Sequence, residues 1–162
     1  MTAPHIRRIL VPVDFSFSSR EAIQHGLWLA ERAGASVTLL HVWQPPLQLT
    51  ADAVAMMAGS VNSTLEQGDL KRAEGDLEAW RRSYGGRGVS VDTRFEQGPI
   101  AGTILRVVGD QGYDLVVMGT HGRTGLARLV MGSVAQHVVA RAPCPVLTVH
   151  GHEEDSPQPS AS

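Results

Sequence analysis

The sequence predicts a single α/β domain in which helices cover both faces of a parallel β-sheet. Short apolar runs alternate with longer amphipathic stretches along most of the 162 residues, as in βαβ proteins. Two of these runs, 9–13 and 115–119, contain no polar residue, which is typical of strands buried on both faces. We therefore expect a doubly wound three-layer sandwich over residues 1–150. The remainder, 151–162, is acidic and then rich in proline and serine, and we expect a disordered tail there.

The chain opens with a strand, a helix and a second strand. The first strand, 9–13, ends in Asp14, and a helix begins near Arg20 and ends at Gly34. The candidate N-caps of this helix are Ser16, Ser18 and Ser19. The second strand, 36–42, is rich in β-branched and apolar residues. A right-handed crossover joins parallel strands connected in this way.

The middle of the chain is less regular. The stretch 45–68 is polar and contains scattered glycines, and we expect a loop there with a short helix at 51–58. Apolar residues then recur at steps of three and four over 70–84, which predicts an amphipathic helix. The third strand, 89–95, alternates apolar and polar residues, so we expect it at an edge of the sheet.

The last third supplies two more strands, each preceded by a helix. A helix has Pro99 in its first turn, where the missing N–H is tolerated, and the apolar strand 115–119 follows. A last helix is expected at 133–141, before a fifth strand at 145–150. The two all-apolar strands belong at the centre of the sheet, which gives the strand order 3-2-1-4-5. Ligands of such sheets bind at the switch point, outside the carboxyl ends of the strands.

Composition excludes several classes of function. The formal net charge of −2 is too small to hold nucleic acid non-specifically. Lys71 is the only lysine and Cys144 the only cysteine, so a P-loop lysine, a disulfide within the chain and a cysteine metal cluster are all excluded. No apolar stretch reaches the roughly 20 residues that span a bilayer. We expect a soluble cytoplasmic protein with neither nucleic acid nor a membrane as partner.

The segment after the fourth strand carries the strongest chemical signal. Gly119 and Gly122 follow a buried strand, and Gly132 and Ser133 open the next helix. Glycines let backbone N–H groups approach an anion closely, and a helix N-terminus adds further N–H donors. No G-x-x-x-x-G-K-[ST] occurs, and no G-x-G-x-x-G follows the first strand. From this chemistry alone, a phosphate-binding loop and a merely tight loop are equal alternatives.

This glycine spacing and the segments around it resemble the universal stress protein family. The spacing of the glycines looks like the nucleotide-binding motif of that family. Two residues separate Gly119 from Gly122, and nine residues separate Gly122 from Gly132, which Ser133 follows. Four segments resemble strands of that family, namely 9–14, 39–42, 114–122 and 143–149. The resemblance runs from about residue 7 to residue 150 and is weakest over 45–68. It implies the fold of the adenine nucleotide alpha hydrolase-like proteins.

The resemblance also implies a site for an adenine nucleotide, ATP or else ADP or AMP, with magnesium bridging its phosphate oxygens. The Asp14 carboxylate would bind the ribose or lie near the adenine, and the backbone of Val42 would pair with the adenine edge. Pro12 and Met118 would give the base apolar contacts. Asp14 has a second interpretation, in which it caps the helix that follows.

The phosphate side of the implied site lies in the glycine motif. Gly119 and Gly122 would line the ribose and phosphates, and Arg123 would add charge from the loop. The groups that would hold the phosphate chain are Gly132, Ser133 and the N–H of Val134. The resemblance implies in addition a homodimer, formed by pairing the edge strand Val146 to His150 with its symmetry mate.

These features favour a nucleotide-dependent regulatory or signalling module of the stress response. The sequence offers no acid–base pair and no nucleophile with a partner, so at most slow ATP hydrolysis is expected. One alternative is a nucleotide-free dimeric scaffold, against which the intact glycine motif argues. Another alternative is an adenylate-forming or sulfur-transferring ATPase, which needs an S-G-G-x-[DS] loop after the first strand. Residues 14–18, at that place, read D-F-S-F-S and argue against this alternative.

Overall fold

The computed structural model describes residues 5–44, 61–86, 88–121 and 131–151. Its strands are β1 (Arg8–Pro12), β2 (Ser36–Trp43), β3 (Val91–Gln97), β4 (Leu115–Gly119) and β5 (Val146–Val149). Its helices are α1 (Phe17–Ala33), α3 (Val61–Tyr84), α4 (Ile100–Gln111) and α5 (Ser133–Arg141). The strands form one parallel sheet in the order β3-β2-β1-β4-β5. The predicted fold and strand order are thereby confirmed.

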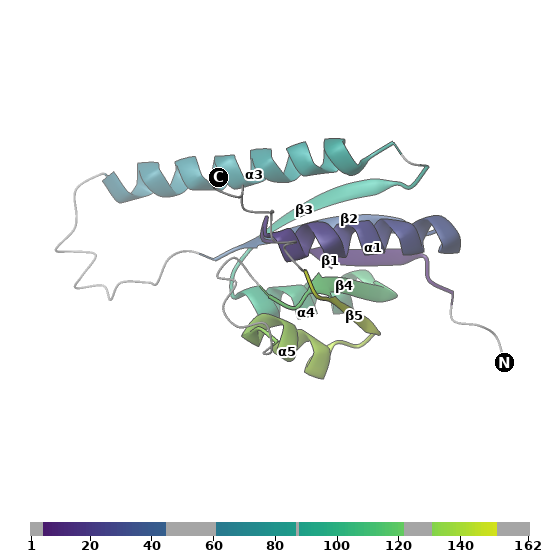
Figure 1. The fold of residues 1–162 in the computed structure, drawn as a ribbon. Helices are drawn as coiled ribbons and strands as arrows, with labels where there is room; N and C mark the ends of the chain where they lie inside the picture. Colours follow the sequence, from purple (N-terminus) through teal and green to yellow (C-terminus); the bar gives the residue numbers. More distant parts are fainter. Residues whose placement is uncertain (1–4, 45–60, 87, 122–130, 152–162) are drawn as a thin grey trace, which may run out of the picture.

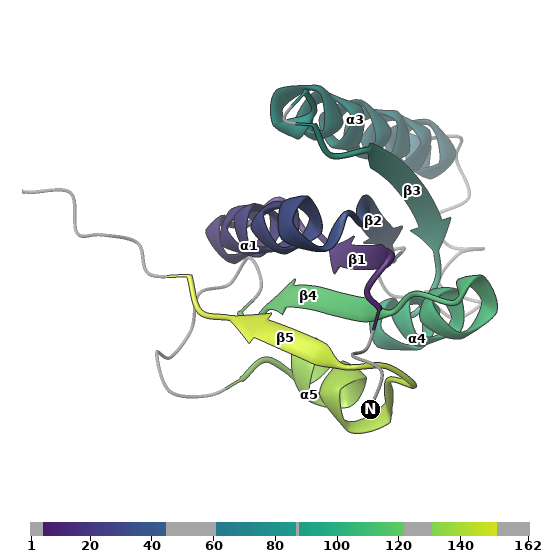
Figure 2. The same ribbon diagram turned by 90° about the vertical axis from the view of Figure 1, so that its right-hand side faces the viewer.

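The sheet separates two hydrophobic layers, because successive side chains of a strand point to opposite faces. Ile9 and Val11 of β1 pack with α1 and α3, whereas Leu10 between them packs with α4 and α5. Figures 1 and 2 show this arrangement, with α1 and α3 on one face and α4 and α5 on the other. The two layers bury β1 and β4, the strands predicted to be central.

Helix α1 begins at Phe17, before the predicted start near Arg20. The N-cap is Ser16, whose side chain accepts a hydrogen bond from the Ser19 N–H at 3.2 Å. Apolar periodicity marks only the turns that contact the sheet, so it begins later than the cap. Gly34 ends the helix in a left-handed conformation with φ 67°, a backbone geometry that glycine adopts without steric cost. At α4, Pro99 is likewise the N-cap rather than a residue of the first turn.

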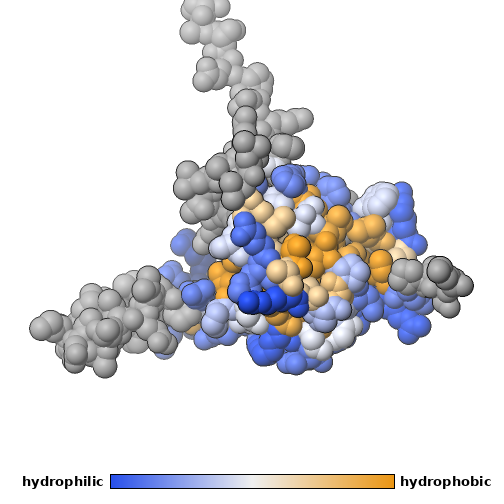
Figure 3. Space-filling view, turned by 90° about the horizontal axis from the view of Figure 1, so that it is seen from below, coloured by the Kyte–Doolittle hydropathy of each residue, from blue (hydrophilic) through white to orange (hydrophobic). Residues whose placement is uncertain are grey.

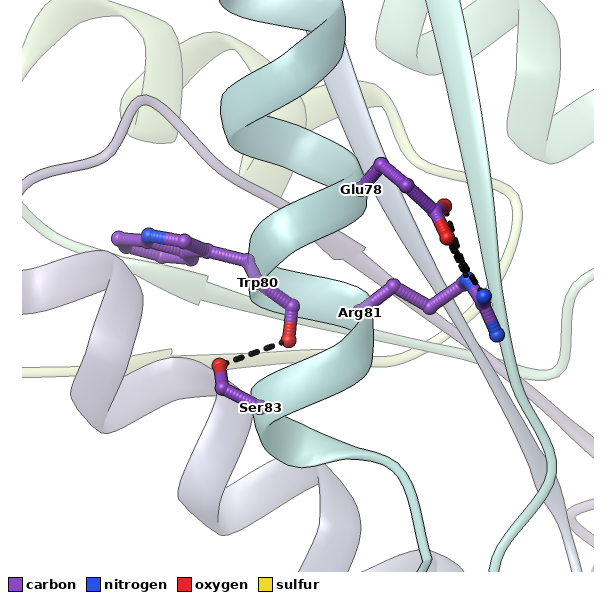
Figure 4. A network of polar contacts seen from close by, with 4 residues as sticks. All are labelled: Glu78, Trp80, Arg81 and Ser83. Carbon is purple, nitrogen blue, oxygen red and sulfur yellow. Dashed lines mark hydrogen bonds and ion pairs between the residues drawn. The ribbon is translucent and has the colours of Figure 1, made fainter.

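Helix α3 also begins earlier than predicted, at Val61 instead of near Leu70. It continues through Gly68, although glycine in a helix interior costs about 1 kcal/mol relative to alanine. Figure 4 shows two local contacts near its end: the Arg81 guanidinium binds the Glu78 carboxylate at 2.5 Å, and the Ser83 hydroxyl donates to the Trp80 carbonyl. The guanidinium lowers the pKa of Glu78. The short helix predicted at 51–58 lies outside the described residues.

The sheet has two edges, β3 and β5, so the prediction of an edge position for the third strand is confirmed. Figure 3 views the side where β5 and α5 lie in Figure 1, and hydrophobic residues gather across that face. Leu147 of β5 is 37% exposed and Val139 of α5 is 46% exposed. Of the described helices, none has the combined length and apolar character needed to cross a membrane.

Candidate functional site

A cavity of about 320 Å³ opens at the carboxyl ends of the central strands. It lies where β1 and β4 diverge, since these strands pair at Ile9–Leu115 and Leu10–Val116 and then separate into α1 and the segment after β4. Eight predicted site residues line it, and they are Pro12, Asp14, Val42, Met118, Gly119, Gly132, Ser133 and Val134. The remaining two, Gly122 and Arg123, lie outside the described residues. The topological switch point therefore gathers the predicted residues in one place, and their roles toward a nucleotide stay predictions.

Asp14 lies on the cavity wall at the turn between β1 and α1. Its Oδ1 accepts hydrogen bonds from the Ser19 hydroxyl at 2.7 Å and from the Ser16 N–H at 3.1 Å. The Asp14 N–H in turn donates to the Ser19 Oγ at 3.0 Å. Because Ser16 is the N-cap of α1, Asp14 is not the cap itself but the residue that orders the turn before it. Oδ2 accepts none of the hydrogen bonds made among the described residues.

Ser19 lines the cavity beside Asp14, and the sequence interpretation considered it only as a possible helix cap. The signal that could have found it is its spacing, since a serine in the first turn of a helix can reach back to a residue just before the cap. Other cavity residues that the prediction did not include are Val13, Leu40, Ile100, Ile104, Thr120, His121 and Ala135. Most of these are apolar and belong to the packed layer under α4 and α5.

The end of β2 presents main-chain groups to the cavity at Val42. The Val13 N–H donates to the Leu40 carbonyl at 2.8 Å, so Leu40 directs its backbone groups toward β1. The N–H and C=O groups of successive residues point to alternate edges of a strand, so those of Val42 point to the same edge as those of Leu40. At the level of Val42, β1 has already turned away from this edge. Val42 offers one N–H donor and one C=O acceptor on a single edge, beside apolar cavity walls.

The N-terminus of α5 forms the opposite wall. Gly132 is its N-cap and makes no side-chain cap hydrogen bond, and the first helical bond joins the Gln136 N–H to the Gly132 carbonyl at 3.0 Å. The N–H groups of Ser133, Val134 and Ala135 consequently have no acceptor within the helix. These donors and the positive end of the helix dipole together attract anions.

Two backbone contacts hold this wall in place. The Gly132 N–H donates to the Thr120 carbonyl at 2.7 Å, and the Thr120 N–H donates to the Val149 carbonyl at 3.0 Å. The end of β4, the end of β5 and the start of α5 are thus tied through Thr120, whose side chain is buried. The Thr120 hydroxyl also lies 2.9 Å from Nδ1 of His121, which brings the His121 side chain into the cavity wall.

Gly119 has a packing role that the sequence did not reveal. A Cβ added there would lie 2.6 Å from the Ser18 Cβ of α1, and 3.1 Å from its backbone carbon. Carbon atoms in contact ordinarily lie 3.5–4.0 Å apart. The absence of a side chain at Gly119 therefore lets the start of α1 approach the end of β4, in addition to leaving space in the cavity.

The charge of the site is low. Among the described lining residues, Asp14 is the only carboxylate and neither lysine nor arginine occurs. Within the described part of the chain, no group of three or more His, Cys, Asp or Glu side chains could hold a metal ion. Asp114, just before β4, lies at the opposite end of the sheet, and its carboxylate accepts hydrogen bonds from the Arg7 and Arg8 N–H groups at 2.8 and 2.9 Å.

Comparison with known proteins identifies the family. A sequence model of the Universal stress protein family matches residues 5–150. The chain belongs to the universal stress protein family. The chain is 33% identical over 145 residues to universal stress protein MJ0531 of Methanocaldococcus jannaschii, with 88% of this chain and 81% of that protein covered.

Solved structures of this family have the same fold. Universal stress protein UspA from Lactobacillus plantarum superimposes with a TM-score of 0.77 and 26% identity, over 91% of this chain and 99% of that one. A universal stress protein family protein from Arabidopsis thaliana, solved with AMP bound, gives a TM-score of 0.56 at 21% identity. Its alignment covers 94% of this chain and 96% of that chain.

Proposed function

We propose that this universal stress protein binds an adenine nucleotide in the cavity at the carboxyl ends of β1, β2 and β4. The observation that carries the proposal is the pairing of two main-chain surfaces across one cavity. Val42 offers a donor and an acceptor to a base edge, and the first amides of α5 offer donors to an anion. The family relative with AMP bound supports the choice of nucleotide.

The parts of the nucleotide follow from the chemistry of the walls. The adenine lies between Pro12 and Met118 and pairs with the Val42 backbone, as the apolar walls there favour an aromatic base. The ribose lies beside Asp14, whose Oδ2 has no partner among the described residues. The phosphates extend to Gly132, Ser133 and the Val134 N–H. Gly122 and Arg123, outside the described residues, belong to the same proposal.

Magnesium accompanies the phosphates in this proposal. Mg²⁺ prefers oxygen ligands and keeps several waters when it binds through substrate phosphates. The described cavity provides one carboxylate, Asp14, which suits an ion held by phosphate oxygens better than one held by a cage of protein ligands.

The protein serves as a regulatory or signalling module in the stress response, in the cytoplasm, with hydrolysis slow at most. Rapid hydrolysis needs a base that positions water at the terminal phosphate. Asp14 is held by Ser16 and Ser19 at the turn after β1, whereas the phosphate wall is formed by α5. The carboxylate therefore serves binding rather than turnover.

The same proposal includes a homodimer formed through β5. This strand is a sheet edge, and the side chain of Leu147 on it is exposed. Edge strands with exposed apolar side chains tend to pair with another chain. Pairing of β5 with its symmetry mate would cover Leu147 and satisfy the backbone groups of Val146 to His150.

The test uses a charge at the start of α5. Ser133→Glu places a carboxylate where phosphate would bind, and the matched variant Ser133→Gln has the same size without the charge. Because acidic residues stabilise helix N-termini, Ser133→Glu is expected to keep or raise the melting temperature. ATP affinity, measured calorimetrically with magnesium, is expected to fall about tenfold or more in the glutamate variant and at most about twofold in the glutamine variant.

Nucleotide carried through purification gives a second readout. Wild-type protein purified without added nucleotide is denatured, and the released material is identified by chromatography, with adenine nucleotide as the expected product. A folded wild-type protein that releases no nucleotide and binds no ATP would contradict the proposal and favour the nucleotide-free scaffold. Unchanged ATP affinity in both Ser133 variants would place the phosphates away from α5.

A further inference from the structure

His41 lies on β2 next to Val42 but on the other face of the sheet. Its side chain does not line the cavity. Instead it is half-buried beneath α1 and α3, with its ring 4.6 Å from the Phe15 ring and 5.6 Å from the Phe95 ring. Its Nδ1 lies 2.8 Å from the Val13 carbonyl oxygen. Since a carbonyl only accepts, Nδ1 carries the proton in this hydrogen bond.

The Val13 carbonyl is the point where β1 stops pairing with β2. The register Pro12–Leu40 and the hydrogen bond from the Val13 N–H to the Leu40 carbonyl are the last of the regular ladder. In a ladder that continued, the next bond would run from the Val42 N–H to the Val13 carbonyl. No backbone hydrogen bond between Val42 and Val13 occurs among the described residues.

A histidine side chain thus occupies the acceptor that the ladder would give to Val42. The His41 ring stands on the α1 and α3 face of the sheet, because His41 follows Val37 and Leu39 of that face at steps of two. A hydrogen bond from a side chain on that face competes for the Val13 carbonyl with one from the Val42 N–H in the plane of the sheet. The Phe15 ring on one side and the Phe95 ring on the other fix the imidazole in this orientation.

We infer that His41 is a positioning residue for base recognition: by holding the Val13 carbonyl, it keeps the Val42 N–H available to the adenine ring. The inference rests on the proposed function for its ligand. Val42 then presents a donor and an acceptor together, which matches the N1 acceptor and the N6 amino donor of adenine. The hypoxanthine edge of inosine carries the opposite pattern, a protonated N1 and a carbonyl, and is mismatched.

Two variants separate the hydrogen bond of His41 from its packing. His41→Phe keeps an aromatic ring between Phe15 and Phe95 but removes the donor. His41→Asn loses the ring but keeps an amide donor close to the position of Nδ1. If donation to the Val13 carbonyl is what matters, the asparagine variant behaves like wild type and the phenylalanine variant does not. If packing matters, the order is reversed.

The first measurement needs no ligand. Amide hydrogen exchange of Val42 is followed by NMR in the ligand-free protein, with the Leu40 amide, which lies within the ladder, as internal control. We expect the Val42 amide to exchange fast in wild type and in His41→Asn. In His41→Phe the freed Val13 carbonyl accepts from it, and exchange relative to Leu40 slows about tenfold or more. A Val42 amide as protected as Leu40 in ligand-free wild type would overturn the inference.

The second measurement compares ligands with and without the base. We expect His41→Phe to weaken ATP binding about fivefold to tenfold, in line with one lost hydrogen bond, and to narrow the preference for ATP over ITP. Inorganic tripolyphosphate, which has no base, is expected to bind all three proteins alike. Equal weakening for ATP and tripolyphosphate, or a loss shared by His41→Asn, would overturn the positioning role. If wild type binds neither ligand while Val42 exchange responds as expected, the proposed function fails and the role of His41 at Val13 stands.

Discussion

Replacing Gly119 by alanine tests whether the close approach of β4 and α1 builds the site. The added Cβ would lie 2.6 Å from the Ser18 Cβ, so the two elements must separate by about 1 Å to restore ordinary contact. Overpacking of this kind costs about 1–3 kcal/mol. Gly119 does not have a positive φ, so alanine regains about 0.4–1 kcal/mol through the unfolded state. The net destabilisation is about 1–2 kcal/mol, a fall in melting temperature of about 3–6 °C for a domain of this size.

A double-mutant cycle can assign the destabilisation of Gly119→Ala to its contact with Ser18. Ser18→Gly removes the atom at 2.6 Å and leaves the nearest Ser18 backbone atom at 3.1 Å. The double variant should therefore recover about 1 kcal/mol relative to the sum of the single variants. Gly109→Ala is the matched control, because it lies in α4 with no atom within 4 Å of the added Cβ. This control should be neutral or stabilising by up to about 1 kcal/mol.

Urea denaturation measures these free energies, and ATP titration measures the effect on the site. A shift at Ser18 carries the start of α1 with it, including Ser19, which holds the Asp14 carboxylate. ATP affinity should fall in Gly119→Ala and recover partly in the double variant. Unchanged stability of Gly119→Ala, or a double variant with no coupling, would refute the packing role of this glycine.

Two further predictions concern regions away from the cavity. The Arg7 and Arg8 N–H groups lower the pKa of Asp114 by hydrogen bonding to its charged form. The contribution of Asp114 to the free energy of unfolding is therefore fully present above the unfolded pKa of about 3.9, and it is lost as the pH falls through the folded pKa. Asp114→Asn should therefore lower the free energy of unfolding by about 1–2 kcal/mol at pH 7. This difference between wild type and variant should shrink as the pH falls through the folded pKa of Asp114, and a difference that stays constant in urea titrations down to the acid limit of folding would contradict the prediction. Leu147→Asp should convert the proposed dimer to a 17.4 kDa monomer in size-exclusion chromatography with light scattering. The control Ala79→Asp, on the exposed side of α3, should leave the proposed dimer intact. A wild-type protein that is already monomeric at micromolar concentration would refute the proposed dimer.

The parts of the fold that the sequence predicted depend on burial. Two runs without any polar residue had to lie at the centre of the sheet, and that placement determines both the strand order and the position of the cavity. The start of α3 was predicted too late because Gly68 was interpreted as the end of a loop, whereas the helix continues through it. A single glycine costs too little to end a helix of this length.

The candidate site was predictable in outline and not in its supporting contacts. Spacing along the chain indicated Gly119 as a candidate site residue, but its contact with Ser18 depends on how α1 lies against β4. His41 was passed over for a related reason. In the sequence it is one polar residue in an apolar strand, and its bond to Val13 depends on where β1 leaves the sheet.

The groups that face the proposed ligand are mainly backbone atoms, and this bears on what the site can do. Main-chain donors at Val42 and at the start of α5 are fixed by the ends of rigid elements, so they bind without the rotamer entropy that long side chains lose. They provide no group that gains or loses a proton near neutral pH. A site of this kind is suited to sensing occupancy, because binding changes contacts at the ends of several elements at once. Chemistry on the terminal phosphate would require a base positioned beside α5, and among the described lining residues the one carboxylate belongs to the turn after β1.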